Sequence, residues 1–449
     1  MDKHTRNRSK EQEGRQQAEV VTDLCYRFVQ PLLHKLYQKL DRRLVQTLFD
    51  LLLVIVVHRH RNHGLLLSEL GGHLLDGAHA PAGTKRIHNL LRHPGWQAQT
   101  ISDYLWEQAD QGVQERLHPQ EDVYVIWDES VVEKAESLKP ERLCAVRSSK
   151  ARRLKRIKPG YYNPPGGRPI FVPGFNWLQV IVTGMRGAPV LAHLRYWTTR
   201  GEAQTTKRQE EHQVLQQVAK RWGQMVVHIW DRGFAGAPWL GLALFYRVRF
   251  IVRWQKSYNL LAADGRKLKA WQCTQGKRSM DHRLIYDTVR RCQRKTGIVY
   301  VPVQVPDSPD VPLTLVVSRP GKGRTPWYLI TNEPVQTVED AWRIVLAYNR
   351  RWQVEVSFRY SKSELAFESP RLYKWERREK LLAIAALVQA FLFSLLQADW
   401  ESLRNRLLRA WCHRTGKRNR TKAVPLYRLR LALSSLWLAF RPLALPRLN

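Results

Sequence analysis

The sequence predicts an α/β protein in which a β-rich insertion interrupts the core and helical regions flank it on both sides. Short β-branched apolar runs alternate with helical patterns, which indicates an α/β core. A stretch with Pro and Gly turns contains β-type segments such as IVYVPVQV and VPLTLVVS. We therefore expect a helical N-terminal region at 1–116, a core in two parts at 117–256 and 326–398, the insertion at 257–325 and a basic helical region at 399–449.

The N-terminal region contains a predicted helix, turn and helix between residues 67 and 92. The motif GAHAPAG would form the turn, and Thr84 is the expected N-cap of the second helix. This second helix carries side-chain types that contact phosphates and base edges. A basic surface helix without such a role is the alternative. The candidates for DNA binding are Lys85, Arg86, Asn89 and Arg92.

Two buried strands are predicted in the core, and an aspartate follows each of them. The run VYVIW at 123–127 precedes Asp128, and VVHIW at 226–230 precedes Asp231. An acid at the carboxyl end of a buried strand lies at the rim of the sheet, where the sites of α/β proteins form. One such aspartate is usually a turn or capping residue. Two that follow the same apolar pattern indicate a shared site.

The other core elements follow in an alternating order. The chain between Asp231 and Glu355 is longer than one helix and one strand require, which is the reason for placing an insertion there. Trp271, Tyr286 and Tyr300 of the insertion are candidates for stacking on nucleic-acid bases, with core packing as the alternative. We expect core strands at 175–183, 189–197 and 250–254, and core helices at 205–222 and 237–246.

A third acid lies among cations in the stretch YNRRWQVEVSFRYSK. The stretch contains no Pro or Gly, so we expect it to continue the helical run that starts at Val338. On one α-helix the spacing would place a phenol, two cations and the acid within an arc of about 60°. A carboxylate among cations suits a metal ion that sits against phosphates, whereas a solvated charged face is the alternative. The four residues are Tyr348, Arg351, Glu355 and Lys362.

Three carboxylates without a Cys or His cluster suit hard, oxygen-preferring ions. Asp128, Asp231 and Glu355 are therefore predicted metal ligands for Mg²⁺ or Mn²⁺. The five cysteines are scattered without a CxxC pair, which favours free thiols in a reducing cytosol and argues against a zinc module.

The three acids, in this order, resemble the DDE triad of cut-and-paste transposases. The spacing Y-x2-R-x3-E-x6-K resembles the YREK signature of the bacterial insertion-sequence-four family. The sequence DRGF, which starts at Asp231, resembles the sequence that this family usually has after its second strand. The resemblance spans about residues 123–362. It implies an RNase H-like core with a β insertion, in which two Mg²⁺ or Mn²⁺ ions on the triad support cleavage at element ends and strand transfer into target DNA.

The resemblance also implies partners and further roles. Tyr348, Arg351 and Lys362 would contact DNA phosphates. The DNA would be double-stranded, comprising the terminal inverted repeats of an element and its target, and the protein would act as a homodimer in the DNA complex. Two alternatives stay open: a domesticated DNA-binding protein without catalysis, and an RNase H-like nuclease that cuts without joining.

The charge of the chain points independently to a polyanion. There are 74 Lys and Arg against 39 Asp and Glu, a net charge of +35, for which nucleic acid is the default partner and a membrane surface the weaker alternative. Residues 147–158 contain seven basic residues and no acid, which suggests binding of a substrate strand, with solubility as the alternative. The residues singled out in this basic tract are Lys150, Arg152, Arg153, Lys155 and Arg156.

Neither the N-terminal residues nor the longest apolar stretch suggests a membrane protein. The first residues are charged and lack an apolar signal core. The apolar stretch 381–396 is interrupted by Gln389 and Ser394 and is short for a membrane span, so we expect a buried helix. A cytoplasmic, nucleoid-associated protein is expected. Residues 399–449 carry twelve Lys and Arg, and Leu and Trp recur among them at helical spacing, which suits helices that contact DNA or a second subunit.

Overall fold

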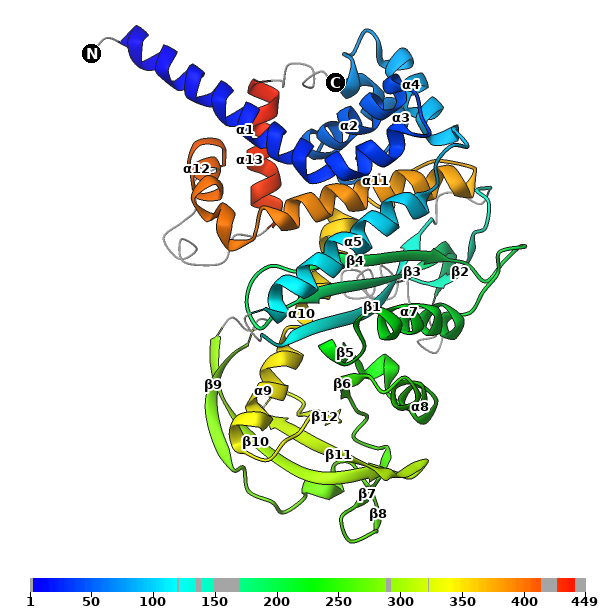
Figure 1. Cartoon of the computed structure of the whole chain (residues 1–449), viewed down its shortest axis with the longest axis vertical. Helices are drawn as coiled ribbons and strands as arrows, with labels where there is room; N and C mark the ends of the chain where they lie inside the picture. Colours follow the sequence, from blue (N-terminus) through cyan, green and yellow to red (C-terminus); the bar gives the residue numbers. More distant parts are fainter. Residues whose placement is uncertain are drawn as a thin grey trace, which may run out of the picture.

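The computed structural model of the chain describes residues 3–118, 121–134, 139–148, 170–287, 292–321, 323–412 and 426–440. The protein is a mixed α/β structure built on a twelve-stranded sheet. The N-terminal helices and the C-terminal helices gather at one end of the molecule, and the sheet extends from there to the other end (Figure 1). Residues 150–156, which contain the basic tract candidates, lie outside the described residues.

The core part of the sheet has three parallel strands in its middle. β1 pairs in parallel with β5, and β5 pairs in parallel with β6. β3 is antiparallel to both β1 and β4, which gives the order β4-β3-β1-β5-β6, and an additional strand β2 also pairs with β3. The expected core strands are all present. Their bounds are β1 Val123–Glu133, β2 Cys144–Arg147, β3 Phe171–Thr183, β4 Val190–Trp197, β5 Val226–Trp230 and β6 Arg249–Arg253.

β1 is longer than the sequence pattern predicts. The apolar run ends at Trp127, yet the strand continues through Asp128 to Glu133. The reason is its antiparallel neighbour, because β3 pairs with β1 as far as Glu133 and Gly174. The parallel pairing with β5 stops at Ile126 and Ile229. Asp128 therefore lies inside a strand, but at the point where one of the two neighbouring strands has ended.

Residues 257–325, where the insertion was expected, contain β7 to β11, and these strands extend the core sheet through β12. β12 pairs antiparallel with β6, and the order continues through β11, β10, β7 and β8. β9 pairs with β10. The bounds are β7 Asn259–Ala262, β8 Lys267–Lys269, β9 Asp281–Asp287, β10 Cys292–Val305, β11 Ser308–Arg319 and β12 Trp327–Thr331.

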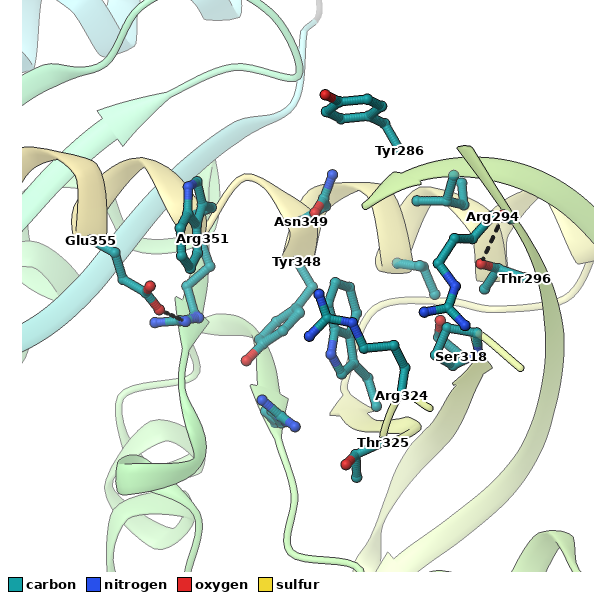
Figure 2. Close-up of a pocket in the computed structure, with 16 residues that line it drawn as sticks. Tyr286, Arg294, Thr296, Ser318, Arg324, Thr325, Tyr348, Asn349, Arg351 and Glu355 are labelled. Carbon is teal, nitrogen blue, oxygen red and sulfur yellow. Dashed lines mark hydrogen bonds and ion pairs between the residues drawn. The ribbon is translucent and has the colours of Figure 1, made fainter. Parts of the chain in front are cut away.

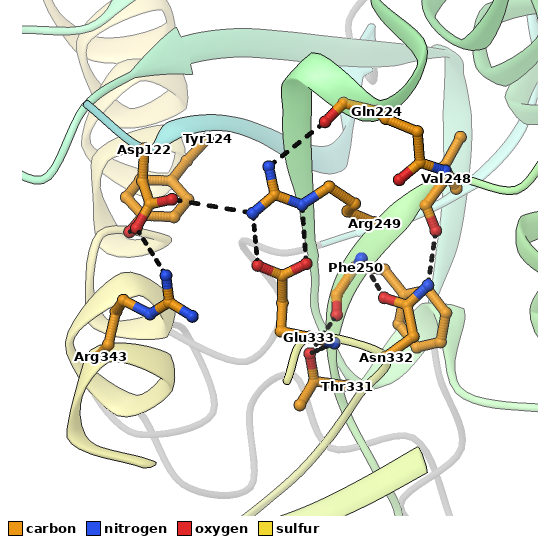
Figure 3. A network of polar contacts seen from close by, with 10 residues as sticks. All are labelled: Asp122, Tyr124, Gln224, Val248, Arg249, Phe250, Thr331, Asn332, Glu333 and Arg343. Carbon is orange, nitrogen blue, oxygen red and sulfur yellow. Dashed lines mark hydrogen bonds and ion pairs between the residues drawn. The ribbon is translucent and has the colours of Figure 1, made fainter. Parts of the chain in front are cut away.

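A polar network holds the chain where it returns from the insertion to the core (Figure 3). Arg249 of β6 donates to both carboxylate oxygens of the buried Glu333, at 2.8 and 2.6 Å. The same guanidinium lies 3.8 Å from Asp122, which also pairs with Arg343 at 3.5 Å. The Asn332 side chain accepts a hydrogen bond from the Phe250 amide and donates one to the Val248 carbonyl, each at 2.8 Å. The start of β1, β6, the end of β12 and α9 (Val338–Asn349) are thereby fixed together.

Helices cover both faces of the core sheet. Ile126 of β1 belongs to the apolar core that includes α5, α9, α10 and α11, whereas Trp127 belongs to the core that includes α7 and α8. The remaining helices have the bounds α1 Lys3–Tyr37, α2 Arg42–Val57, α3 Leu67–Leu74, α4 Ala80–Arg92, α5 Ala98–Leu117, α7 Lys207–Trp222, α8 Ala237–Phe245, α10 Trp352–Ser363, α11 Trp375–Ser394, α12 Glu401–Trp411 and α13 Leu426–Ala439.

The predicted start of α4 was wrong. The helix begins at Ala80, inside the expected turn, because a proline at its first turn is compatible with a helix start. Thr84 is therefore inside the helix and not its N-cap. The Thr84 hydroxyl donates to the carbonyl of Ala80 at 2.8 Å.

The apolar stretch at 381–396 lies mainly in α11, which is buried along most of its length, as expected. In the described part of the chain, no single helix is long and apolar enough to cross a membrane. One bent pair of helical segments, Trp375–Ser394 and Ala398–Trp411, has the length and apolar composition of a membrane span when the two are taken together, with an angle of 77° between them.

Candidate active site

The register of the parallel strands brings Asp128 and Asp231 together. Ile126 and Ile229 are opposite each other in β1 and β5. Each aspartate comes two residues later, so both lie beyond the last parallel pair and on the same face of the sheet as the isoleucines. Asp231 also accepts a hydrogen bond from the Gly233 amide at 2.6 Å, so it has the capping role that single strand-end aspartates usually have.

The third acid comes from α10, but the four-residue helical face is interrupted. A single helix from Val338 through Lys362 was predicted, and this was wrong, because α9 ends at Asn349 and α10 begins at Trp352. The Arg350 and Arg351 amides each donate to the carbonyl three residues earlier, at 3.0 Å, which tightens the chain into a turn. Tyr348 therefore lies on α9, whereas Glu355 and Lys362 lie on α10.

Arg351 lies at the N-cap of α10 and connects two of the acids. Its Nη1 is 3.4 Å from Asp128 Oδ2, and its Nη2 pairs with Glu355 Oε1. The guanidinium is 6.0 Å from the centre of the Tyr348 ring. The Arg351 side chain is 14% exposed, so this pairing is largely removed from water. Burial alone would lower the pKa of Arg351, but Tyr348, Glu355 and Asp128 together raise it.

The electrostatics of Asp128 show that the acids repel each other. Burial, followed by the charges of Asp231 and Glu355, raises the pKa of Asp128 to about 7. Arg351 and the hydrogen bond from the Glu129 amide oppose this shift. A second cation near the acids would relieve the repulsion that remains.

The donor set fits a divalent metal by its chemistry. Carboxylate oxygens are the ligands that Mg²⁺ and Mn²⁺ prefer, and three of them are electrostatically coupled here. Among the residues that the structure describes, no three His, Cys, Asp or Glu side chains are grouped closely enough to hold a metal. Arg351 lies between Asp128 and Glu355 in this arrangement, so it supplies the positive charge that a metal would otherwise supply.

A pocket of about 360 Å³ opens beside Glu355. Figure 2 shows that its walls come from α9, α10 and the strands of the insertion. Tyr348 is buried in one wall, with Trp327 packed edge-to-face at 5.1 Å. The lining combines aromatic and cationic side chains, and it includes Arg253, Tyr286, Arg294, Arg324, Trp327, Tyr348, Arg351, Trp352 and Glu355.

The predicted stacking aromatics of the insertion differ in their positions. Tyr286 lines the pocket and is 43% exposed. Trp271 is not among the lining residues. The Tyr300 hydroxyl donates to the Gln336 carbonyl at 3.0 Å, and this tyrosine does not line the pocket either. Only Tyr286 has the position that stacking on a base beside Glu355 requires.

The remaining DNA-binding candidates lie away from this pocket. Lys362 is on the same face of α10 as Glu355 but two turns further along, about 10 Å at 1.5 Å per residue. On α4, Lys85 and Arg92 are exposed and Asn89 is half-buried. The Arg86 side chain is partly exposed and lies beside α2, 3.3 Å from the Thr47 hydroxyl and 3.6 Å from Asp50. Lys150, Arg152, Arg153, Lys155 and Arg156 fall outside the described residues.

Several pocket residues were missed at the level of sequence. Trp352 directly follows Arg351, so its position next to a residue of the YREK spacing could have marked it as a candidate site residue. Arg253 and Trp327 carry no such signal, because they reach the pocket through the pairing of β6 with β12. The pairing of strands from the core and the insertion is a tertiary feature that local patterns do not encode.

Comparisons with known proteins place the chain among transposases. A family model described as a transposase DDE domain matches residues 158–391, slightly more than half of the chain. The match includes Asp231 and Glu355 and begins after Asp128. Among solved structures, the chain is similar to the cryo-EM structure of a piggyBac transposase synaptic complex with hairpin DNA. The TM-score is 0.42 at 14% identity, over 88% of this chain and 76% of that chain.

Proposed function

The chain belongs to the transposase DDE domain family, and from this premise we propose that it catalyses metal-dependent cut-and-paste transposition. The reaction would comprise strand cleavage at element ends and transfer of those ends into target DNA. The observation that carries the proposal is the convergence of Asp128 and Asp231, through strand register, with Arg351 and Glu355 from α10.

We further infer an RNase H-like core and membership in the insertion-sequence-four family. The strand order β4-β3-β1-β5-β6, with β3 antiparallel to its neighbours, supports the first inference. The YREK spacing supports the second, together with the position of Tyr348, Arg351 and Glu355 on one pocket.

Asp128, Asp231 and Glu355 would hold two Mg²⁺ or Mn²⁺ ions. Bound metals would activate the attacking oxygen and stabilise the departing one in an in-line displacement at phosphorus. Around them, Arg351 has the role of a counter-charge that holds Asp128 and Glu355 in the absence of substrate and can donate to a phosphate when DNA is present. Lys362 would contact the DNA backbone further along α10.

The pocket beside Glu355 suits a nucleotide that has left the base stack. Tyr286 and Trp352 offer aromatic faces, and Arg253 offers a cation for a phosphate. Tyr348 is too deeply buried to stack on a base, and it supports the wall together with Trp327. A flipped nucleotide next to the scissile phosphate is therefore the proposed occupant.

The proposed partner is double-stranded DNA, from terminal inverted repeats and from the target. The net charge of +35 supports this partner and gives strong, salt-dependent binding. A homodimer in the DNA complex and a cytoplasmic, nucleoid-associated location complete the proposal. The four candidates on α4 and the basic tract would supply contacts outside the active site.

One experiment separates this function from its alternatives. The full chain is incubated with paired element-end DNA, a target plasmid and Mg²⁺, and the products are resolved on gels. Joined products support transposition. Cleaved ends without joining indicate a nuclease, and binding without cleavage indicates a domesticated DNA-binding protein.

A further inference from the structure

A buried polar cluster lies behind the acid of α10. Ser357 comes two residues after Glu355, and two residues correspond to about 200° around an α-helix, so Ser357 faces away from Glu355 and into the protein. Ser357 is 0% exposed, and so are Gln179 of β3, Ser361 of α10 and Gln389 of α11. We call these four residues the serine clamp.

Two amides converge on the Ser357 hydroxyl from different elements. Gln179 donates to it through Nε2 at 2.7 Å, and Gln389 donates to it through Nε2 at 2.6 Å. The Gln389 amide also lies 3.3 Å from the Ser357 carbonyl, and its Oε1 accepts from Ser361 at 2.6 Å. One hydroxyl therefore connects α10 to the sheet and to α11 at the same time.

The clamp begins directly beside the first acid of the site. Gln179 is the cross-strand partner of Asp128 in the pairing of β1 with β3. Side chains of directly opposed residues lie on the same face of an antiparallel pair. The position of α10 is thus set from the strand position next to Asp128, and the clamp links the locations of Asp128 and Glu355.

Packing alone gives no reason for polar residues here. In the run 381–393 of α11 every residue except Gln389 is apolar, and the buried Gln179 Oε1 has no hydrogen-bond partner among the described residues. Apolar residues of the same volume are often neutral or stabilising at such positions. Hydrogen bonds supply direction, however, which apolar contacts do not, and they fix the rotation of a helix.

Small rotations of α10 matter for the acid. A rotation of about 10° moves a group that lies about 6 Å from the helix axis by about 1 Å. A misplacement of about 1 Å can lower the rate of an enzyme about 100-fold. An anchor on the buried face of α10 therefore controls the geometry on its opposite face.

We propose that Gln179, Ser357 and Gln389 are positioning residues that set the place of Glu355 relative to Asp128. The proposal rests on the proposed function, because the reaction that it supports is the one assigned to that site. None of the three residues contacts the reacting atoms, and each acts through Glu355.

The test uses the full chain and volume-conserving variants that cannot form these hydrogen bonds. The variants are Gln179→Met, Gln389→Met, Ser357→Ala and the double variant Ser357→Ala with Gln389→Met. The matched control is Ser434→Ala, because Ser434 is a buried serine of α13 that donates to the Val57 carbonyl at 2.8 Å. Four quantities are measured: the single-turnover cleavage rate of prebound DNA ends, DNA affinity, Mn²⁺ affinity without DNA, and the thermal unfolding midpoint.

Each clamp variant is expected to cleave at least about 10-fold more slowly, with DNA affinity within about twofold of wild type and a chain that stays folded at the assay temperature. The unfolding midpoint of Ser357→Ala should fall moderately, because this change leaves two buried amide donors without their acceptor. Mn²⁺ affinity should fall, because the Glu355 carboxylate would no longer be held in its position relative to Asp128. The double variant should be no slower than the slower single variant, since both changes break the same hydrogen bond. The Ser434→Ala control should match wild type in cleavage rate and in both affinities, and only its unfolding midpoint should fall, because it loses one buried hydrogen bond.

Wild-type cleavage rates in folded clamp variants would overturn the proposal. So would single losses that multiply in the double variant, or losses explained by a smaller folded fraction. If the methionine variants do not fold, Ser357→Cys keeps the size of the side chain, weakens the acceptor and carries the same expectation. Wild-type protein that fails to cleave refutes the proposed function itself, whereas cleavage by wild type and clamp variants alike refutes only the clamp.

Discussion

Arg351 Nη1 lies 3.4 Å from Asp128 Oδ2, although 223 residues separate the two in the chain. The same guanidinium pairs with Glu355, one turn further along α10. A single cation therefore holds a strand acid and a helix acid together. This relationship makes Arg351 part of the site as well as a candidate for phosphate contact.

Arg351→Ala is expected to lower strand cleavage more than DNA affinity. The change removes the cation between Asp128 and Glu355, while most of the positive charge of the protein lies elsewhere. Loss of one such electrostatic group typically costs about 100-fold or more in rate. Arg351→Lys should recover only part of the activity, because an ammonium cannot pair with two carboxylates in a fixed fork. A variant that loses most DNA binding but cleaves bound DNA normally would contradict this role.

Asp128→Asn, Asp231→Asn and Glu355→Gln should each abolish Mg²⁺-dependent cleavage, by about 100-fold or more, and spare DNA binding. Each change removes one anionic oxygen ligand and leaves the size of the side chain nearly unchanged. Cleavage of labelled end DNA and equilibrium binding are measured in parallel. Near-normal cleavage by any one variant removes that residue from the site.

The basic tract is tested through the salt dependence of DNA binding. Each phosphate contact on duplex DNA contributes about 0.9 to the slope of log affinity against log salt. Changing Arg152, Arg153, Lys155 and Arg156 to Ser should therefore flatten the slope by roughly two to four units, with little change in thermal stability. An unchanged slope in a folded variant would assign the tract to solubility and leave DNA binding to other regions.

The pKa of Glu379 predicts how the stability of the protein depends on pH. Burial raises the pKa of this carboxyl to about 7, against the opposing hydrogen bond of Trp375 and nearby arginines. The folded state therefore binds more protons than the unfolded state between pH 4.5 and 7, so Glu379 lowers stability as pH rises through this range. Glu379→Gln should thus be stabilised relative to wild type more at pH 8 than at pH 5, by at most about 3 kcal/mol.

Denaturant unfolding at the two pH values measures this difference. The control is Glu19→Gln, because Glu19 is an exposed acid inside α1. It should show a smaller difference between the two pH values. If the two variants changed the free energy of unfolding equally at both pH values, the pKa of the Glu379 carboxyl would not be raised in the folded state.

The network that closes the insertion should matter for stability. Glu333 is 4% exposed at its side chain and Arg249 is 28% exposed, so Arg249→Met leaves a buried carboxylate without its partner. We expect a loss of about 2 to 4 kcal/mol in the free energy of unfolding, of which the added change Glu333→Leu recovers a part. Urea unfolding of both variants measures this. A loss below about 0.5 kcal/mol for the single change would show that water reaches the carboxylate.

The strands and the identity of the acids were predictable because their signals are local. The run 226–230 gave β5 with the correct bounds, since a fully buried strand is a short apolar run with clear ends. The spacing around Glu355 identified three residues that line the pocket, Tyr348, Arg351 and Glu355, although the helix that was expected to carry all four is broken after Asn349. A turn of residues in helical conformation has no distinct composition, so the break was not visible.

The rest of the site depends on contacts between distant segments. Gln179 and Gln389 read as ordinary polar residues, and only the fold brings both onto Ser357. Trp327 reaches the pocket because β12 pairs with β6, which no local pattern specifies. The extension of β1 past Asp128 likewise depends on its partner β3.

The pairing of β6 with β12 also has a mechanical consequence. Hydrogen bonds run from strand to strand across this junction, so the core and the insertion share one sheet (Figure 1). A force that bound DNA exerts on Tyr286 or its neighbours is therefore transmitted through β10, β11 and β12 to β6 and β5, and from there to Asp231. Under the proposed function, the insertion would therefore resist displacement by DNA and act as a wall that moves together with the acids.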